Sequence, residues 1–431
     1  MPQRKDAAYQ KKGSAVRSIR HLPFNVHFLA SCDEFVYYEA NNKRQGDDQV
    51  KLGYLLIPGM GYTTNSKKRK GVLLMPTWMI YGANGYMGEL IAREAKARGL
   101  HPILAGRNAR ALSKLGQELG CDTRIFDLRD PAVTMQQLTG VAAVLHCAGP
   151  FSVTSRPLLD ACLRTGTHYL DITGEIAVFE AIFGRAEEVK QARIIALPGV
   201  GFDVVPTDCL AAFLKRQLPD AIHVRLAFAS KYGRLSRGTT KTLIGVLDQG
   251  YLMRQDSHII EVAPRLAQIP FGDQVVSALR ISWGDVSTAY YSTGIPTIEV
   301  YAGGSKSVKQ IQQLYRLRRL IGRGPVQALL QRIITRTMTG PTETERADDE
   351  CLLWGEVTNA AGQQVTLTLR TPEGYNVTMD AAVTAVVALL EGDLPPGAYT
   401  PSLAFGPEFV LGLRGVVGPA QEGAAALTSE G

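Results

Sequence analysis

Short apolar runs alternate with amphipathic stretches over residues 78–197. Short apolar runs fit strands that are buried on both faces of a sheet, and apolar positions repeating every three or four residues fit helices. The pattern predicts strands at 78–81, 102–106, 123–128, 141–147, 169–171 and 193–197, and helices from 89 to Gly99 and at 109–119, 155–163 and 176–192. This repetition predicts an α/β fold, a doubly wound parallel sheet of the Rossmann type.

The pattern after residue 205 is looser but still mixed. It predicts strands at 222–229, 275–283 and 296–301, a hairpin of 352–357 with 364–369, and helices at 210–217, 236–253 and 377–390. The last helix is apolar nearly all round, so it should be deeply buried. The hydroxyl-rich stretch 284–294 could form one wall of a substrate site or a polar loop. These elements predict a second α/β domain.

The first predicted strand leads into a glycine turn with G-x-x-G-x-x-G spacing. Gly82 permits the tight turn, Gly85 lets a pyrophosphate approach the backbone, and Gly88 lets the helix pack close to the sheet. The N-terminus of that helix offers N–H groups and a positive dipole end to phosphates. An ordinary glycine-rich turn is the alternative to nucleotide binding. The residues assigned to the cofactor here are Gly82, Asn84, Gly85, Tyr86, Met87 and Gly88.

The second predicted strand ends at Arg107, where sites that prefer NAD usually place Asp or Glu for the ribose 2′-hydroxyl. A guanidinium suits a 2′-phosphate because its fork of N–H groups binds phosphate oxygens bidentately. The sequence therefore favours NADP(H), the alternative being a solvated arginine at a strand end.

Two further strand ends supply candidate cofactor contacts. Asp127, followed by Leu128, could accept a hydrogen bond from the adenine amino group or could cap the helix that begins near Pro131. The fourth strand ends in Ala148, Gly149 and Pro150. That strand end should lie at the switch-point crevice, where the nicotinamide would sit.

Several blocks of the chain together resemble the saccharopine dehydrogenase-like family of NAD(P)-dependent reductases, which includes the bacterial trans-acting enoyl reductases. The blocks are 81–88 (YGANGYMG), 104–108 (LAGRN), 146–151 with 161–175 (HCAGPF, ACLRTGTHYLDITGE), 198–208 (PGVGFDVVPTD) and, more weakly, 371–375 (TPEGY). The resemblance covers about residues 77–415 and is most specific in the first half.

The resemblance implies a domain organisation. We expect an NADP-binding Rossmann domain at 75–205, a second α/β substrate or dimerisation domain at 206–372, and C-terminal residues 373–431 whose helix packs back on the first domain. It also implies that Asp171, Glu175, Phe202 and Asp203 lie in the cleft between the domains.

The chemistry expected of such a cleft is hydride transfer. NADPH would reduce an imine, carbonyl or activated alkene, while Asp171, Glu175 or Asp203 orients the substrate or relays a proton. None of the 16 tyrosines has a lysine four residues later, which argues against the Tyr-x-x-x-Lys mechanism of short-chain dehydrogenases. Two alternatives stay open, a trans-acting enoyl reductase for a lipid or carrier-bound substrate, and a non-catalytic NADP(H)-binding sensor.

Cysteine and histidine usage argues against a metal site. The six cysteines form no Cys-x-x-Cys pair and the seven histidines no His-x-x-x-His pair, so we expect no metal and no disulfide framework. Unpaired cysteines favour a reducing compartment, so we expect a cytoplasmic protein.

The basic charge of the chain is confined to its N-terminal extension. The formal net charge is +7, and residues 1–74 hold 13 Lys and Arg against 6 Asp and Glu, which leaves 34 of each sign in the rest. The extension could be a disordered tail or a basic arm. We favour a mis-annotated start. Met75 precedes the first Rossmann strand, as in a bacterial protein, and the run 67–71 (KKRKG) would have purine-rich codons like those of a ribosome-binding site.

The neutral remainder shapes the expected partners. We expect a small-molecule or acyl substrate and no nucleic acid, because the chain after residue 74 has no net positive charge to attract a phosphate backbone. No segment approaches the roughly 20 apolar residues of a membrane span. Residues 307–337 form a basic amphipathic helix pair that could touch a membrane surface or an acidic partner, or could simply be a solvated face over core. Residues 338–350 are predicted to be a polar loop. A homodimer is the expected assembly.

Overall fold

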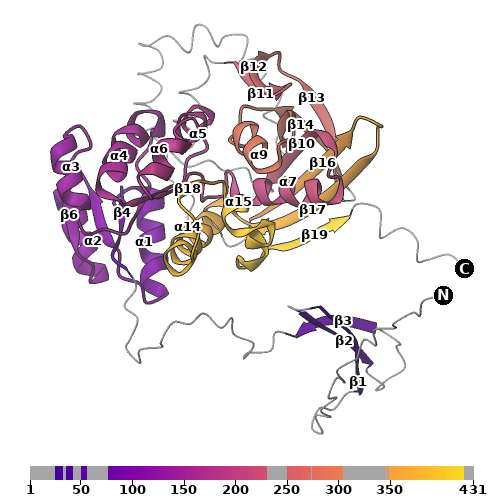
Figure 1. Ribbon diagram of the computed structural model, residues 1–431, viewed down its shortest axis with the longest axis horizontal. Helices are drawn as coiled ribbons and strands as arrows, with labels where there is room; N and C mark the ends of the chain where they lie inside the picture. The colour runs from indigo at the N-terminus through magenta and orange to yellow at the C-terminus, as the bar shows by residue number, and fades with distance from the viewer. Residues whose placement is uncertain are drawn as a thin grey trace, which may run out of the picture. The chain divides into compact units, whose positions relative to one another are not determined.

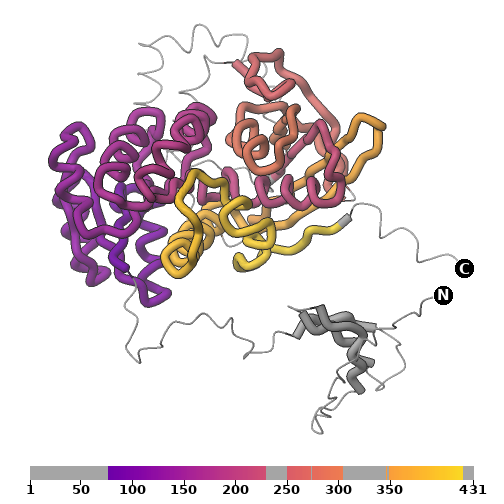
Figure 2. The backbone as a smooth tube through the Cα atoms, viewed as in Figure 1, coloured from indigo at the N-terminus to yellow at the C-terminus, as the bar shows by residue number. Residues whose placement is uncertain are grey.

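The computed structural model of the chain describes three strands near the N-terminus and then residues 76–230, 250–272, 274–303, 346 and 349–421 (Figure 2). The chain divides into two compact units, Met1–Leu73 and Leu74–Gly431. In the first unit an antiparallel sheet, which the pattern did not predict, consists of β1 (Asn25–Cys32), β2 (Phe35–Asn41) and β3 (Val50–Leu55). Most of residues 1–74 lie outside the described residues. The three interpretations of this extension, as a disordered tail, a basic arm or a mis-annotated start, therefore stay predictions.

The first half of the second unit is a seven-stranded parallel sheet of strand order β18-β9-β8-β7-β4-β5-β6. In chain order its first six strands are β4 (Trp78–Tyr81), β5 (Ile103–Gly106), β6 (Thr123–Ile125), β7 (Ala143–His146), β8 (His168–Asp171) and β9 (Ile195–Leu197). The order reverses between β4 and β7, which is the doubly wound arrangement with its switch point between those strands. The predicted α/β class and Rossmann sheet are confirmed.

Helices connect the parallel strands, and their bounds follow local capping. They are α1 (Tyr86–Ala97), α2 (Ala109–Leu119), α3 (Pro131–Leu138), α4 (Phe151–Thr165), α5 (Ile176–Phe183) and α6 (Ala186–Gln191). The α2 helix matches its predicted bounds because Asn108 accepts the N–H of Ala111 and Gly120 ends the helix in the left-handed conformation. The single helix predicted over 176–192 is wrong, since the chain breaks at Gly184 and Arg185 to form two.

The second half contains a nine-stranded mixed sheet. Its strands are β10 (Ala221–Ser230), β11 (Tyr251–Gln255), β12 (His258–Val262), β13 (Leu266–Phe271), β14 (Gln274–Arg280), β15 (Thr297–Gly303), β16 (Glu350–Asn359), β17 (Gln364–Pro372) and β19 (Val417–Gln421). The predicted hairpin is confirmed as β16 and β17. With α7 (Val205–Gln217) and α9 (Asp285–Thr293) it confirms a second α/β domain.

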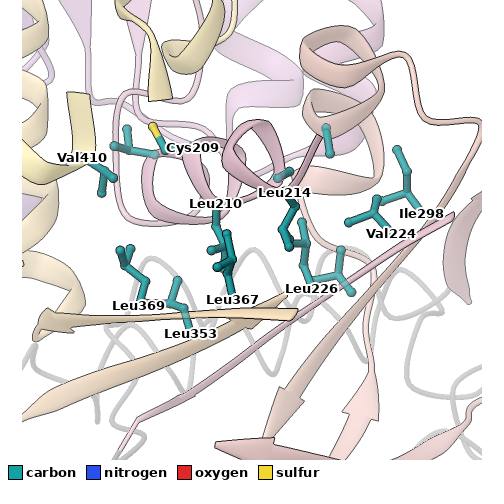
Figure 3. Packing of buried hydrophobic residues seen from close by; sticks show 14 of the residues in the cluster. Cys209, Leu210, Leu214, Val224, Leu226, Ile298, Leu353, Leu367, Leu369 and Val410 are labelled. Carbon is teal, nitrogen blue, oxygen red and sulfur yellow. The ribbon is translucent and has the colours of Figure 1, made fainter. Parts of the chain in front are cut away.

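The apolar core of the second half forms where α7 packs on this sheet (Figure 3). Leu210 points from the helix toward Leu367 of the hairpin, and Leu214 points toward Leu226 of β10. A Cβ at Gly355 would lie 2.6 Å from Leu214 Cδ1, so the strand needs glycine where the helix approaches it.

Three predictions for this half need correction or lie outside the described residues. Residues 251–253 were expected to end a helix but belong to β11, where they pair with β12, and the rest of that predicted helix is outside the described residues except Gly250. The stretch 284–294 is not a loop, because it forms α9. The predicted helix pair at 307–337 and most of the polar loop at 338–350 lie outside the described residues.

The last long helix, α14 (Gly374–Glu391), returns to the first domain and lies beside α1 (Figure 1). One apolar cluster contains buried Ile91 and Ala92 of α1 together with Ala382 and Val386 of α14. Arg98 at the end of α1 also pairs with Asp380. Beyond α14, β18 (Gly397–Ala398) adds an edge strand to the first sheet, while α15 (Pro401–Phe405) and the 3-10 helix η2 (Pro407–Gly412) pack near α7. The expected return of the C-terminal helix is confirmed.

Candidate functional site

The glycine turn after β4 is shaped by close backbone contacts. Gly82 has φ +89°, and a Cβ there would lie 2.8 Å from Ala148 Cβ. A Cβ at Gly88 would lie 2.2 Å from the carbonyl oxygen of Gly82. The Gly82 N–H donates to the carbonyl of Ala105 on β5 at 2.7 Å. The turn is therefore folded tightly against the sheet and the switch point, as the spacing of the glycines predicts.

The N-terminus of α1 has the features of an anion-binding helix end. The helix begins at Tyr86 after Gly85, and no side chain caps it. The first N–H groups of an α-helix have no partner within the helix, and the helix dipole is positive at this end. A helix end of this kind is a general anion-binding feature, and the predicted cofactor residues Gly82, Asn84, Gly85 and Met87 lie in the turn beside it.

Arg107 lies at the same edge of the sheet, directly after β5, and its side chain is exposed. The strand pairs in parallel with β4, so the end of β5 stands next to the glycine turn. A Cβ at Gly106 would lie 3.1 Å from Asn84 Oδ1, which shows how closely the turn and this strand end approach. Arg107 is placed where the adenosine ribose of a dinucleotide would lie in such a fold.

Asp127 does not cap the following helix. Asp130 is the N-cap of α3 and accepts the N–H groups of Ala132 and Val133, so the capping alternative for Asp127 is wrong. Asp127 instead binds the guanidinium of Arg129, and these hydrogen bonds lower the pKa of the Asp127 carboxyl to about 2. The carboxylate can only accept hydrogen bonds at neutral pH. Its neighbour Leu128 is buried in the core.

The loop after β7 is fixed by a histidine that the sequence reading did not single out. His146 is fully buried, and burial lowers its pKa to about 3, so the ring is neutral. Its Nδ1 accepts the Ala148 N–H at 3.4 Å, which leaves Nε2 to donate to Thr154 Oγ1 at 2.9 Å. Thr154 Oγ1 in turn lies 2.7 Å from the Ala148 carbonyl. This network positions Ala148 and the Gly149–Pro150 segment, whose peptide bond is cis.

Two of the three predicted catalytic carboxylates bind backbone N–H groups. Asp171 is fully buried and accepts hydrogen bonds from Tyr169 Oη and from the N–H groups of Thr173 and Gly199. Glu175 accepts the N–H groups of Phe151 and Ser152, each at 2.8 Å, at the N-terminus of α4. These contacts tie the loops after β7, β8 and β9 together, so both carboxylates position the loops that surround the crevice.

Asp203 differs from the other two in its hydrogen bonding. Its pKa does not distinguish it from Asp171, because burial also raises the pKa of Asp171 to about 6. Its side chain is partly buried, and Gly174 faces it so closely that a Cβ there would lie 2.7 Å from Asp203 Oδ2. Within the described ranges no group donates a hydrogen bond to this carboxylate. Burial raises its pKa from 3.8 to about 6. A carboxyl that titrates near neutral pH at the carboxyl edge of a Rossmann sheet can exchange a proton with a substrate.

The start of α14 covers this edge of the sheet. Thr378 Oγ1 accepts the N–H of Phe202 at 3.0 Å, and a Cβ at Gly374 would lie 3.1 Å from the Phe202 ring. The weakly matching block 371–375 therefore contacts the loop that carries Asp203. The blocks 198–208 and 371–375 are far apart in the sequence, and only the folded chain brings them together.

Two further aspartates are buried behind Asp203. Asp285 accepts a hydrogen bond from Thr207 Oγ1 at 2.9 Å, and Asp208 accepts the N–H of Ser402 at 2.8 Å. Burial raises the pKa of both carboxyls, that of Asp285 well above 3.8, and the charges of Asp208 and Asp203 raise it further. In the described part of the chain no three His, Cys, Asp or Glu side chains are grouped so as to hold a metal ion.

Asp285→Asn should change how stability depends on pH. The pKa of Asp285 is higher in the folded than in the unfolded protein, so its stabilising effect is complete below about pH 4 and is lost as pH rises through the folded pKa. The neutral amide removes that loss, so we expect the free energy of unfolding of the variant to rise relative to that of wild type as the pH increases from 5 to 9. Urea unfolding across this range measures the difference, and parallel curves for the two proteins would contradict it.

Comparison with known proteins identifies the first domain. The family model described as the saccharopine dehydrogenase NADP binding domain matches residues 78–197. A saccharopine dehydrogenase-like oxidoreductase of Bos taurus is 24% identical over 160 residues, which are 32% of this chain and 37% of that protein. A trans-acting enoyl reductase of Mycobacterium leprae is 34% identical over 144 residues, which are 30% of this chain and 33% of that protein. The chain thus matches about a third of the length of these relatives.

The fold extends the likeness beyond this domain. The structure of saccharopine dehydrogenase (L-Glu forming) from Saccharomyces cerevisiae superposes with a TM-score of 0.55 and 12% identity, covering 78% of this chain and 96% of that one. Identity this low shows a shared fold alone. The comparisons confirm the predicted resemblance and a nicotinamide dinucleotide as the cofactor of the domain. None of the described helices is long and apolar enough to cross a membrane.

Proposed function

Because residues 78–197 belong to the saccharopine dehydrogenase NADP-binding domain family, we propose that the chain is an NADP(H)-dependent oxidoreductase. NADPH bound at the glycine turn supplies a hydride to an imine, carbonyl or enoyl group held near Asp203. The enoyl group is included because one relative is named a trans-acting enoyl reductase. The observation that carries the proposal is the Asp203 carboxyl, which has no described hydrogen-bond donor.

The neighbouring strand ends support this placement. The strand order β9-β8-β7-β4 sets their following loops side by side along one edge of the sheet. Gly82 contacts Ala148 in two of these loops, and Glu175 joins the loop after β8 to the start of α4. The contact of Asp203 with Gly174, in the loop after β8, supports our assignment of this carboxyl to the same edge of the sheet as the nucleotide turn. Ligands of open α/β sheets bind at such an edge.

The roles proposed for the other carboxylates differ from that of Asp203. Asp171 and Glu175 are positioning residues, since their oxygens bind backbone N–H groups and hold the loops in place. Asp203 holds or delivers the proton that accompanies hydride transfer. Asp127 accepts a hydrogen bond from the adenine amino group, and Arg107 binds the 2′-phosphate.

Arg107→Asp tests the cofactor assignment. We expect wild type to bind NADPH more tightly than NADH, and the variant to lose about 10- to 100-fold of that preference, because hydrogen bonds to charged groups contribute about 1.5–3 kcal/mol. Fluorescence titration with each reduced dinucleotide measures both affinities. Arg110→Asp, the same charge change at an exposed position in α2, is the control and should leave the preference nearly unchanged.

The outcomes separate the alternatives. A preference that survives Arg107→Asp would exclude 2′-phosphate recognition by this residue. If the wild-type protein binds neither dinucleotide, the oxidoreductase proposal fails. If it binds NADPH but oxidises it with no amino-acid, keto-acid or enoyl substrate, the result favours a sensor over an enzyme.

A further inference from the structure

Arg346 reaches the nucleotide turn from far along the chain. Its Nη1 donates to Tyr86 Oη at 2.9 Å, although the two residues are separated by 260 positions. Tyr86 is the first residue of α1 and follows Gly85 directly. A guanidinium from the second half of the chain therefore contacts the side chain of the first residue of α1.

Neighbouring contacts hold Arg346 in this position. Asn376 Nδ2 donates to the Arg346 carbonyl at 3.0 Å, and the ring of Tyr375 meets that of Tyr86 edge to face at 5.4 Å. Arg346 itself is only 9% exposed. An arginine whose backbone and guanidinium are both bound loses little further conformational entropy when a ligand arrives.

The charges around the turn favour a cationic partner there. The turn from Gly82 to Gly88 contains no Lys or Arg, so its own contribution to phosphate binding is limited to N–H groups and the helix dipole. Glu373 lies close enough to Arg346 for their charges to interact, but its carboxylate already accepts the N–H groups of Tyr375 and Asn376. The contact of Arg346 with Tyr86 therefore brings a guanidinium near a turn that has no cationic side chain of its own.

We propose that Arg346 is a cofactor-binding residue that supplies positive charge to the pyrophosphate of the dinucleotide at the head of α1. The inference rests on the proposed NADP(H) function and adds a contribution from outside the matched domain. Two anionic groups of the same ligand are then bound by two different arginines. Arg107 recognises the ribose 2′-phosphate, and Arg346 recognises the pyrophosphate. Cofactor binding then joins the segment preceding β16 to the first domain.

Two ligands distinguish these sites. NADPH carries both the 2′-phosphate and the pyrophosphate, whereas adenosine 2′-monophosphate carries only the former. We expect Arg346→Met to raise the Kd for NADPH about 10- to 100-fold, the range expected for hydrogen bonds to charged groups, and to leave the Kd for adenosine 2′-monophosphate unchanged. Arg107→Asp should weaken both ligands. Isothermal titration calorimetry measures each Kd, and thermal unfolding without ligand checks the fold of each variant.

Two further variants guard against a purely structural effect. Arg346→Lys keeps the charge and should recover most of the NADPH affinity. Tyr86→Phe removes the hydroxyl that holds the guanidinium and should weaken NADPH selectively but less than Arg346→Met. Equal weakening of both ligands in these variants, or unchanged NADPH affinity in Arg346→Met, would overturn the assignment while the proposed function stands. Wild-type protein that binds neither ligand would overturn both.

Discussion

Asp203→Asn is expected to slow turnover by about 10²- to 10⁴-fold, the usual contribution of a positioned general acid or base. The amide has nearly the shape of the carboxyl but cannot deliver its proton. In wild type, reduction should slow as pH rises through about 6, because the raised pKa of Asp203 keeps its carboxyl protonated only below that value. The variant should lose this dependence. Steady-state NADPH oxidation against pH, with any substrate that supports turnover, measures both effects.

A contrasting variant controls for loss of structure. Asp171→Asn changes a carboxylate that accepts three hydrogen bonds, two of them from backbone N–H groups. It should lower the unfolding temperature, because an amide cannot accept all of them. Asp203→Asn should not lower that temperature, because burial raises the pKa of the Asp203 carboxyl and its removal therefore does not destabilise the folded protein above pH 6, and the NADPH affinity should stay nearly unchanged. A wild-type rate in Asp203→Asn would show that this carboxyl takes no part in proton transfer.

Gly88→Ala should abolish cofactor binding. The added Cβ would lie 2.2 Å from the carbonyl oxygen of Gly82 and 2.9 Å from Ala83 Cα, so α1 must move away from the turn. Forcing extra atoms into a packed region costs about 1–3 kcal/mol of stability, and the displaced helix end would no longer present its N–H groups to the pyrophosphate. Calorimetric titration with NADPH and urea unfolding measure the two losses.

Gly412→Ala is the matched control for this change. A Cβ at Gly412 would have no atom within 4 Å, so the same methyl group should alter neither NADPH affinity nor stability. Normal NADPH binding by Gly88→Ala would mean that the close approach of helix and turn is unnecessary for the cofactor.

The local pattern of apolar and polar residues was sufficient to predict most strands and helices of the first domain. Most strands of its sheet, apart from the edge strands β6 and β18, are short apolar runs next to helices, and features such as Asn108 and Gly120 mark the helix ends within a few residues. The strand β18 could not be predicted because it consists of Gly397 and Ala398 alone, and two residues are too few to show a hydrophobic period.

Tertiary contacts decided the elements that the pattern missed. The hydroxyl-rich stretch 284–294 suggested a loop, yet it forms α9 because its polar groups find partners within the fold. Ser287 Oγ and Tyr291 Oη both donate to the carboxylate of Glu180 on α5. This partner cannot be inferred from the stretch itself.

The same limit applies to the candidate site. The sequence placed Asp171, Glu175 and Asp203 in one cleft but could not say which carboxylates bind backbone N–H groups, since that depends on where the loops after the strands end. Spacing could not find Arg346 either, because Tyr86 lies 260 positions away. The glycine turn was predictable because its chemistry is contained in seven consecutive residues.

The position of α14 affects the order in which the protein can mature. Ile91 and Ala92 share their apolar cluster with Ala382 and Val386, almost 300 positions later. During synthesis from the N-terminus, the nucleotide domain emerges long before the helix that covers this face. Until translation is nearly complete, that face stays open to water or to a chaperone, so the protein acquires its finished cofactor domain among the last steps of folding.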